Sequence, residues 1–356
     1  MRQFKTILVT GGAGFIGSNF IRHVLRKTDF AGRIVNFDAL TYAGNAHNLD
    51  DVAAECGGRY VFLHADIRDA SAVREAMERF DVDAVAHFAA ESHVDRSIAA
   101  PDAFVQTNIV GTFNLLQAAR ERGGTLSLFH HVSTDEVFGS LGPEGFFSET
   151  TPYAPHSPYS ASKAASDHLA RSFHDTYGLP VTVTNCSNNY GPYQFPEKLV
   201  PLMVLNALEG KALPVYGEGL NVRDWLHVED HCEAIWTVMT RAAAGETYCV
   251  GGRNEMRNVD VVRRVCDLVD RLAPPLPSGA PRFSLVRHVA DRPGHDRRYA
   301  IDCTRLEKAF GWKPAHDAES GFGETVRWYL ENPAWVDSVR SGAYREWISA
   351  NYGSRA

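Results

Sequence analysis

The sequence has no long apolar run, no excess of basic residues and no closely spaced pair of cysteines. The charge-free stretch from residue 177 to residue 196 contains Gly, Asn, Ser, Thr and Pro, whereas a membrane span needs about 20 predominantly apolar residues. Lysine and arginine together number 36 against 43 for aspartate and glutamate, a formal net charge of −7. General nucleic-acid-binding proteins normally carry a basic face. We therefore expect no membrane-spanning segment and no nucleic-acid partner.

The six cysteines are scattered along the chain, and none belongs to a C-x-x-C motif. Extracellular domains held by disulfides are usually shorter and denser in cysteine. The first ten residues, MRQFKTILVT, run directly into an expected strand, which leaves no room for the regions of a secretory leader. These features predict reduced thiols and a cytoplasmic protein.

Short apolar runs alternate with helical segments in the first half of the chain. Continuous apolar strands separated by helices are typical of a parallel sheet that is covered on both faces. After about residue 190 this alternation gives way to short strands, helices and loops rich in Pro, Gly and Arg. We predict an α/β fold, with a doubly wound parallel Rossmann sheet over residues 1–190, segments that return to it near 225–250, and a smaller mixed α/β substrate lobe over 191–356.

The apolar patterns place the expected elements as follows. Strands are predicted at residues 5–10, 33–38, 60–64, 84–90, 125–134, 181–188, 213–216 and 247–250. Helices are predicted at residues 18–27, 101–122, 158–177, 199–209, 230–240 and 259–272.

A glycine-rich turn joins the first expected strand to the first helix. Gly11, Gly14 and Gly17 fit G-x-x-G-x-x-G, and small residues there let the backbone approach a pyrophosphate at the helix N-terminus. Glycine is also the default turn residue, so the motif alone is weak evidence. Asp38 ends the next strand, 21 residues after Gly17. A carboxylate there accepts a bond from a ribose 2′-hydroxyl and repels a 2′-phosphate, so the pattern predicts NAD in preference to NADP.

Tyr159 and Lys163 form a Y-x-x-x-K motif near the start of the helix at 158–177. The spacing of i and i+4 places both side chains on one helix face. A lysine ammonium near a phenol stabilises the phenolate, which makes Tyr159 a feasible base for a sugar hydroxyl. A surface tyrosine beside a solvated lysine is the alternative for an isolated motif. Its place after a dinucleotide-binding pattern and a strand ending in Ser133 and Thr134 favours the catalytic interpretation.

These motifs, together with several longer blocks, resemble the extended short-chain dehydrogenase/reductase superfamily, and more closely the dTDP-glucose 4,6-dehydratase family. The resemblance covers nearly the whole chain and departs from the pattern at Phe138, where tyrosine is common. The blocks that carry it lie at residues 38–45, 89–92, 133–137, 185–192, 223–225 and 291–295.

Asp135 and Glu136 are the discriminating residues of this resemblance. In isolation, adjacent carboxylates at a strand end could be an exposed loop pair or a helix cap. A 4,6-elimination needs one group to remove the C5 proton and another to protonate the departing C6 hydroxyl, and two carboxyls can do both only if their pKa values are pushed apart. The resemblance makes Asp135 the acid and Glu136 the base.

The resemblance implies that dTDP-glucose is converted to dTDP-4-keto-6-deoxyglucose and water. Tyr159, assisted by Lys163, would remove the 4-hydroxyl proton while hydride moves from C4 to NAD, and Thr134 would bond the 4-hydroxyl. After elimination the hydride would return to C6, so a tightly bound NAD is regenerated in each turnover. The 191–356 lobe would then bind the nucleotide sugar.

Further binding residues follow by match to the family pattern. For Pro214 and Tyr216, simple packing is an equal explanation. The residues expected to bind NAD are Gly11, Gly14, Phe15, Ile16, Gly17, Asp38, Ala39, Leu40, Thr41, Asp66, Ile67, Phe88, Ala89, Ala90, Ser92, Thr107, Tyr159, Lys163 and Asn189. Those expected to contact the nucleotide sugar are Ser92, Thr134, Asn188, Lys198, Leu199, Pro214, Tyr216, Arg223, Asn258, Arg292 and His295.

His227 and His231 are spaced like the zinc ligands of a metalloprotease helix, but Val228 stands where that motif requires Glu. We therefore predict no metal. The helices at 101–122 and 158–177 carry more apolar residues than one buried stripe requires. Together with the oligomeric state that the family resemblance implies, this surplus predicts a homodimer that associates through a helix bundle. The alternative is that these residues only pack against the sheet.

Three other functions stay open. A UDP-sugar 4,6-dehydratase would use the same residues, because thymine and uracil differ by one methyl group. A UDP-sugar 4-epimerase or UDP-glucuronate decarboxylase on this scaffold would need only Thr134, Tyr159 and Lys163, and the carboxylate pair argues against both. A non-catalytic NAD-binding protein is the remote alternative.

Overall fold

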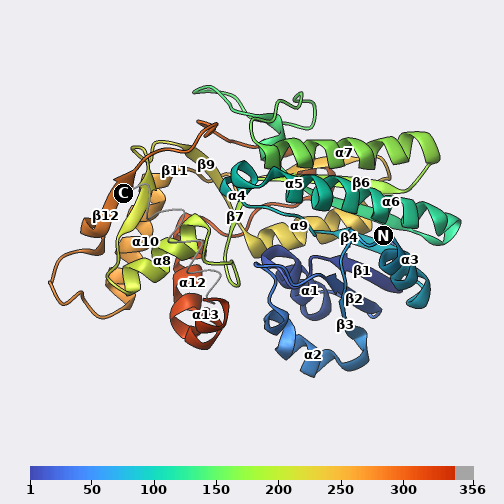
Figure 1. Cartoon of the computed structure of the whole chain (residues 1–356), viewed down its shortest axis with the longest axis horizontal. Coiled ribbons are helices and arrows are strands. Elements are labelled where there is room, and N and C mark those ends of the chain that lie inside the picture. The colour runs from blue at the N-terminus through green and yellow to red at the C-terminus, as the bar shows by residue number, and fades with distance from the viewer. Residues whose placement is uncertain (341–356) are drawn as a thin grey trace.

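The computed structural model describes residues 1–340, and its largest element is a seven-stranded parallel sheet between two layers of helices (Figure 1). The strand order is β10-β6-β5-β4-β1-β2-β3. The chain order reverses between β1 and β4, which is where open α/β sheets bind ligands. The strands are β1 (Thr6–Thr10), β2 (Arg33–Asp38), β3 (Tyr60–His64), β4 (Ala84–His87), β5 (Leu128–Thr134), β6 (Val181–Cys186) and β10 (Thr247–Val250).

Alternate residues of the central strands pack on opposite faces of the sheet. Ile7 and Val9 of β1 belong to one apolar core, and Leu8 belongs to the other. The first core is covered by α1 (Phe15–Lys27), α2 (Asp50–Cys56) and α9 (Val228–Arg241), and the second by α3 (Ala70–Arg79), α6 (Thr112–Glu121) and α7 (Pro158–Tyr177).

Helix α7 has strong signals at both ends. The Ser157 hydroxyl accepts a bond from the Ser160 backbone N–H, and the Ser160 hydroxyl accepts one from the Ser157 backbone N–H. Pro158 occupies the first turn, where its missing N–H costs nothing. Gly178 closes the helix in a left-handed conformation, with φ at 69°. These caps fix Tyr159 in the first turn of α7.

The helix predicted at 101–122 is continuous but changes its winding. After α5 (Pro101–Phe104), residues Val105–Gly111 are π-helical, and α6 follows. The wider turn directs Asn108 into the interior. Its side chain accepts a bond from the Glu91 backbone N–H at 2.9 Å and donates to the Glu91 carbonyl at 3.0 Å. The π-helical segment therefore holds the loop between β4 and α4 (Val94–Ala99).

Three predicted strands of the large sheet are shorter than expected by two or more residues. The strand predicted over 84–90 ends at His87, because residues 88–93 leave the sheet and lead to α4. The strand predicted over 125–134 begins at Leu128, because Gly123–Thr125 form a 3₁₀ turn. The strand predicted over 181–188 ends at Cys186, because the chain then leaves for β7 (Asn188–Tyr190) of a smaller sheet.

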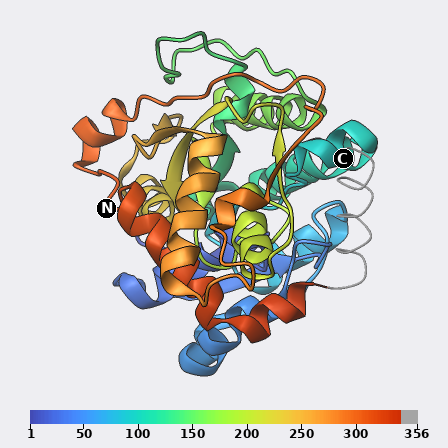
Figure 2. The same cartoon turned by 90° about the vertical axis from the view of Figure 1, so that its left-hand side faces the viewer.

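A second group of elements contains a mixed three-stranded sheet of order β11-β9-β7 and a two-stranded sheet of β12 and β8. Tyr190 and Phe322 stack in its core, with ring centroids 4.3 Å apart. Figure 2 shows helices α10 and α12 packed side by side over this group. Its other strands are β8 (Leu213–Tyr216), β9 (Val222–His227), β11 (Glu255–Arg257) and β12 (Val286–Val289), and its helices are α8 (Leu199–Leu208), α10 (Asn258–Leu272), α12 (Ala318–Glu331) and α13 (Pro333–Val339).

The chain passes between the two groups more than once. After β9 it forms α9 against the large sheet and then β10, which pairs with β6. Residues 341–356, which the sequence assigns to the substrate lobe, lie outside the described residues. Within residues 1–340, no helix has the length and apolarity that a bilayer crossing requires.

Candidate active site

A cavity of about 340 Å³ lies at the carboxyl ends of the central strands, at the reversal of strand order between β1 and β4. It collects residues from both predicted sets, for the cofactor and for the substrate. The predicted residues that line it are Gly11, Gly14, Phe15, Ile16, Gly17, Asp38, Ala39, Thr41, Asp66, Ile67, Phe88, Ala89, Ala90, Ser92, Thr107, Thr134, Asp135, Glu136, Tyr159, Lys163, Asn188, Asn189 and Lys198.

The glycine turn at one end of the cavity has no space for side chains. Gly11 has φ at +71°, and a Cβ there would lie 2.6 Å from the Ala89 backbone nitrogen. A Cβ on Gly17 would lie 2.3 Å from the Gly11 carbonyl oxygen. The turn therefore presents bare backbone beside the N-terminus of α1, which is what a pyrophosphate requires. These residues fit a dinucleotide.

Asp38 ends β2 at the same end of the cavity and is nearly buried. Its Oδ2 accepts a bond from the Ala13 backbone N–H at 2.9 Å, and its Oδ1 accepts one from the Leu40 backbone N–H at 2.8 Å. Burial raises the pKa of Asp38, and the two backbone bonds lower it. Leu40 reaches its bond in a left-handed conformation, with φ at 49°, and does not line the cavity. Each carboxylate oxygen keeps a lone pair for a ribose hydroxyl.

Asp135 and Glu136 follow β5 directly, in a 3₁₀ turn that Thr134 caps. The Thr134 hydroxyl accepts a bond from the Glu136 backbone N–H at 3.3 Å and donates to Asp135 Oδ1 at 3.4 Å. Asp135 is 1% exposed, and its Oδ2 has no hydrogen-bond partner among residues 1–340. Burial and the charges of Glu136 and Asp224 raise the pKa of Asp135 well above its usual value.

Glu136 has a different electrostatic environment from its neighbour. Burial raises its pKa, but the cationic side chains of Arg292, Lys198 and Arg223 lower it. Asp135 therefore retains a proton more readily, and Glu136 ionises more readily. This is the separation that an acid and a base in one site require.

Tyr159 and Lys163 are both buried and reach the cavity from one face of α7. Lys163 Nζ donates to the Val132 carbonyl at 2.8 Å rather than to the phenol. Burial, followed by the charge of Glu136, raises the pKa of Tyr159, and the Thr134 hydroxyl lowers it through a hydrogen bond. The phenol therefore interacts both with the Thr134 hydroxyl and with the carboxyl group predicted to be the base.

Several predicted substrate residues lie outside the cavity lining and form a neighbouring group around Asp95 of α4. The Tyr216 hydroxyl donates to Asp95 Oδ2 at 3.0 Å, and Arg292 Nη1 lies 3.7 Å from Asp95 Oδ1. The Tyr216 ring meets the His295 ring edge-on, with centroids 6.0 Å apart. Arg292 links the two groups, because its charge lowers the pKa of Glu136. The predicted substrate residues that do not line the cavity are Leu199, Pro214, Tyr216, Arg223, Asn258, Arg292 and His295.

Arg223 projects from β9 and is 4% exposed. Its Nη1 donates to the Val222 carbonyl at 2.8 Å and its Nη2 to the Asp296 carbonyl at 2.9 Å. The guanidinium lies over the Tyr299 ring, 4.1 Å from the centroid. Two of its donor directions are therefore already used by backbone carbonyls.

The structure does not bring His227 and His231 to one metal position. The His231 ring shares a hydrogen bond of 2.9 Å with Asn189 Oδ1. His227 approaches His316 and Glu324 instead, with side-chain ligand atoms within 4.8 Å of one another. However, the two imidazoles are stacked, with centroids 3.9 Å apart and planes at 29°. Their lone pairs run side by side rather than converge on one ion, so we assign no metal to this trio.

Several lining residues carried no individual prediction. The sequence blocks that carry the family resemblance could have identified five of them as site residues: Ala43, Gly44, Ser133, Cys186 and Ser187. Residues 194–197 precede α8 in a loop with no motif, and only folding brings Glu197 within 3.2 Å of Arg96. The unpredicted lining residues are Phe37, Ala43, Gly44, Ala65, Arg68, Glu91, Ala103, Val132, Ser133, Cys186, Ser187, Gln194, Phe195 and Glu197.

Comparison with known proteins agrees with this geometry. The family model of GDP-mannose 4,6 dehydratase matches residues 8–325. The chain is 56% identical to dTDP-glucose 4,6-dehydratase 1 of Escherichia coli (strain K12), over 98% of this chain and 99% of that protein. The dTDP-glucose 4,6-dehydratase of Streptomyces venezuelae, solved with NAD and TYD bound, has a TM-score of 0.86 at 48% identity and covers 93% of this chain and 98% of its own.

A more distant relative shares the fold with a different activity. UDP-glucose 4-epimerase of Thermus thermophilus, solved in complex with NAD, has a TM-score of 0.81 at 28% identity, with coverage of 92% of this chain and 99% of its own. Identity is thus far higher to the dehydratases, over nearly full length. The chain belongs to the dTDP-glucose 4,6-dehydratase family of the extended short-chain dehydrogenases/reductases.

Proposed function

We propose that this protein is an NAD-dependent dTDP-glucose 4,6-dehydratase, which converts dTDP-glucose to dTDP-4-keto-6-deoxyglucose and water. The observation that carries the proposal is a pair of adjacent carboxyls at the cavity, the buried Asp135 and the half-buried Glu136, whose pKa values are pushed apart by their surroundings. The full-length similarity to dTDP-glucose 4,6-dehydratases supports the same reaction and the same cofactor.

The first half-reaction uses the residues of α7 and the end of β5. Tyr159 takes the proton of the sugar 4-hydroxyl at its phenolic oxygen, and Thr134 orients that hydroxyl. Lys163 supplies positive charge beside them. Bound NAD supplies the acceptor for the hydride that leaves C4 and the donor for the hydride that C6 receives. Gly11, Gly14, Phe15, Ile16, Gly17, Asp38, Ala39, Leu40, Thr41, Asp66, Ile67, Phe88, Ala89, Ala90, Ser92, Thr107 and Asn189 would hold it.

The second half-reaction uses the carboxyl pair. A ketone at C4 acidifies the C5 proton, and Glu136, ionised beside three cationic side chains, removes it. Asp135, which keeps its proton through burial, donates it to the 6-hydroxyl, so that water leaves. The unpartnered Asp135 Oδ2 is available for that transfer.

The nucleotide end of the substrate would be bound by the group around Asp95 and by the loop before α8. Guanidinium groups suit a diphosphate because they offer paired donors, and Arg292 is the candidate whose Nε has no hydrogen-bond partner within the described chain. The Lys198 ammonium lies beside the cavity and donates to the Ser92 carbonyl at 2.8 Å. The other proposed contacts are Asn188, Leu199, Pro214, Tyr216, Arg223, Asn258 and His295.

A UDP-sugar 4-epimerase would leave Asp135 and Glu136 without a proton-transfer role, so the position of both carboxyls in the cavity lining favours the dehydratase. To decide between nucleotides, the purified protein is incubated separately with dTDP-glucose and UDP-glucose. We expect the alkaline absorbance of a 4-keto sugar with dTDP-glucose. Product from UDP-glucose alone would reassign the nucleotide, and an epimerised sugar without keto product would overturn the dehydratase.

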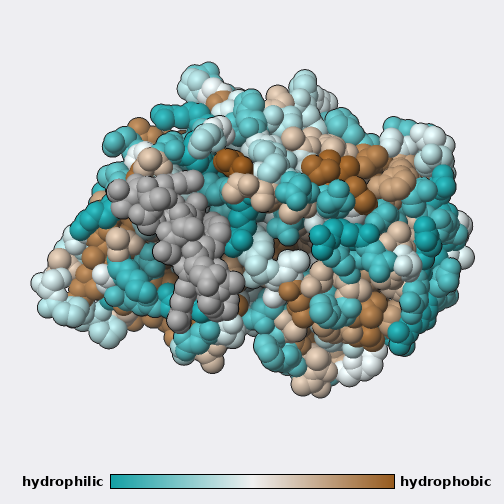
Figure 3. Space-filling view, in the orientation of Figure 1, coloured by the Kyte–Doolittle hydropathy of each residue, from teal (hydrophilic) through white to brown (hydrophobic). Residues whose placement is uncertain are grey.

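We also propose that the protein is a homodimer that associates through the helices at residues 94–121. Four large apolar side chains on them are 36–45% exposed: Ile98, Val105, Val110 and Phe113. Figure 3 shows apolar side chains gathered over these helices on the face toward the viewer. Clustered exposed apolar residues mark protein interfaces. A cytoplasmic location is supported by the six free thiols, of which only Cys56 is not buried.

A further inference from the structure

Lys163 is surrounded by titratable groups from four elements of the large sheet layer. Asp167 lies one helical turn later on α7, and Tyr159 lies one turn earlier. His87 of β4 and His131 of β5 face it, and Cys186 faces it from β6. Burial lowers the pKa of both histidines and raises that of the thiol, so these three groups are neutral at pH 7. Among the residues of the described chain that face Lys163, Asp167 is the one anion.

Asp167 is fully buried and accepts three hydrogen bonds. His131 Nε2 donates to its Oδ1 at 3.0 Å. The Tyr153 hydroxyl donates to its Oδ2 at 2.7 Å, and Asn185 Nδ2 donates to the same atom at 3.1 Å. Arg171 in turn donates to the Tyr153 oxygen at 2.7 Å. These bonds and the positive charges of the site lower the pKa of Asp167 to about 2, so the carboxyl stays ionised.

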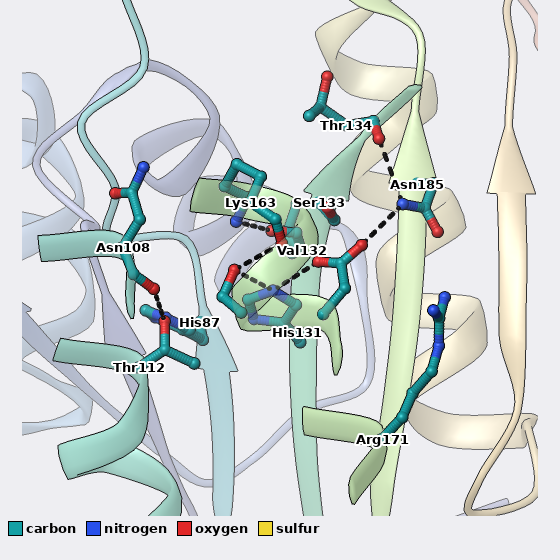
Figure 4. A network of polar contacts seen from close by, with 12 residues as sticks. His87, Asn108, Thr112, His131, Val132, Ser133, Thr134, Lys163, Arg171 and Asn185 are labelled. Carbon is teal, nitrogen blue, oxygen red and sulfur yellow. Dashed lines mark hydrogen bonds and ion pairs between the residues drawn. The ribbon is translucent and has the colours of Figure 1, made fainter. Parts of the chain in front are cut away.

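The same carboxylate connects the two catalytic segments. Asn185 Nδ2, besides its bond to Asp167, donates to the Thr134 carbonyl at 3.2 Å. His131 belongs to the strand that ends at Thr134, and Lys163 bonds the carbonyl of Val132 on that strand. Figure 4 shows His131, Lys163 and Asn185 converging between β5, β6 and α7. Asp167 itself does not line the cavity.

We propose that Asp167 is a positioning residue for Lys163: its buried carboxylate is the counter-charge that keeps the ammonium protonated, while its hydrogen bonds hold β5 and β6 against α7. The catalytic importance of Asp167 rests on the proposed function, in which Lys163 assists Tyr159. Burial alone lowers the pKa of Lys163, and the negative charge of Asp167 opposes that lowering. Lys163 and Asp167 are four positions apart on α7 and therefore lie on one helix face. An opposite charge within about 4–6 Å shifts a pKa by about 1–3 units.

Asp167→Asn tests the charge, since it keeps the size of the side chain. Its amide oxygen can accept from Tyr153 and Asn185, and its NH2 can donate to His131 once that ring carries its proton on Nδ1. Tyr153→Phe is the matched control, because it removes one hydrogen bond from Asp167 and leaves the charge. The first measurement is the pH at which Lys163 becomes reactive toward acetic anhydride, followed by peptide mass spectrometry; it requires no turnover. The second is the alkaline limb of kcat with dTDP-glucose.

We expect Asp167→Asn to move the labelling midpoint of Lys163 and the alkaline limb of kcat to lower pH by about 1–2 units. KM should change little, because Asp167 lies outside the cavity. Tyr153→Phe should leave both midpoints in place. An unchanged labelling midpoint in folded Asp167→Asn, or an equal shift in both variants, would overturn the proposal.

Circular dichroism establishes that each variant is folded. If Asp167→Asn does not fold, Asp167→Ser removes the same charge, admits water into the space, and is judged by the same labelling shift. A wild-type protein that does not convert dTDP-glucose would overturn the proposed function, and the labelling measurement would still decide the role of Asp167.

Discussion

Glu136 follows Asp135 directly in the chain, yet the two carboxyls have unequal electrostatic surroundings. Cationic side chains at positions 292, 198 and 223 lower the pKa of Glu136, whereas the charge of Glu136 itself raises the pKa of Asp135. Ionisation of Glu136 thus makes Asp135 harder to ionise. A strongly coupled pair of this kind carries one proton over a wide pH range, which suits one acid and one base.

The first prediction separates the two half-reactions. Glu136→Gln keeps the shape of the side chain but removes the base, so turnover should fall by about 10²–10⁴-fold. In a single turnover with dTDP-glucose, this variant should accumulate the absorbance of reduced nicotinamide with little keto-deoxy product. Tyr159→Phe should lose the same turnover without that absorbance, because oxidation at C4 itself fails.

Glu144→Gln, on an exposed loop, is the control and should behave as wild type. If Glu136→Gln turns over normally, the assigned base is wrong. If it accumulates no reduced nicotinamide, Glu136 acts before the elimination.

The second prediction concerns cofactor choice. Asp38→Asn removes the charge that repels a 2′-phosphate and disturbs one of the two backbone bonds at Ala13 and Leu40. Losing a charged hydrogen-bond partner costs about 1.5–3 kcal/mol, so NAD affinity should fall roughly 10- to 100-fold. Calorimetric titration of cofactor-stripped protein should also show a smaller preference for NAD over NADP. The exposed variant Asp29→Asn is the control, and an unchanged preference in Asp38→Asn would mean that another residue reads the ribose.

The third prediction is a loss of stability at mildly acidic pH. His130 and His231 are fully buried, with pKa values lowered to about 3, and that of buried His131 is lowered to about 4. Below the unfolded pKa of about 6.5, the unfolded chain binds protons that the folded protein refuses. Their contribution is complete above pH 6.5 and is lost as the pH falls toward 4, by about 1.4 kcal/mol per pH unit for each histidine.

Urea denaturation between pH 7 and pH 4.5 measures that slope. His130→Gln, which keeps a polar partner for Thr182 and Thr184, should lower the slope by about one proton. The exposed variant His47→Gln should leave it unchanged. Equal slopes in wild type and His130→Gln would show that folding does not lower the pKa of His130.

The fourth prediction tests the dimer. Phe113→Lys places a charge on a side chain that is 42% exposed within the apolar patch. Leu272→Lys is a matched control on α10, where the leucine is 43% exposed. Analytical ultracentrifugation should give a monomer for Phe113→Lys and a dimer for wild type and Leu272→Lys. A dimer that survives Phe113→Lys would place the interface elsewhere.

Sequence reasoning succeeded where the signals are local. Strands β2 and β3 and helix α7 agree with their predicted bounds, because short runs rich in apolar residues and paired caps can be recognised within a few residues of sequence. Strand β9 carried no such signal. Its residues Arg223 and Asp224 are charged yet 4% and 1% exposed, so no alternation of polar and apolar residues could identify the strand. Their burial depends on partners distant in the chain, such as Asp296.

The site divides in the same way. Residues within a motif, such as Tyr159 with Lys163, could be placed by spacing alone. Asp95 and Glu197 could not, because no motif marks them and their side-chain partners, Tyr216 and Arg96, are more than 100 positions away in the chain. The π-helical winding that turns Asn108 inward was also invisible, since its sequence is compatible with an ordinary helix.

The outermost strand of the large sheet has a consequence for how the protein can be made. Strand β10 pairs with β6 but is synthesised some 60 residues later, after β7, β8 and β9. Until then the edge of β6 exposes unpaired N–H and C=O groups, a template for association with other chains. A fragment ending near residue 190 would keep that edge permanently and should aggregate. We therefore expect a fragment cut near residue 190 to be less soluble than one that continues through Val250, which keeps β10 paired with β6.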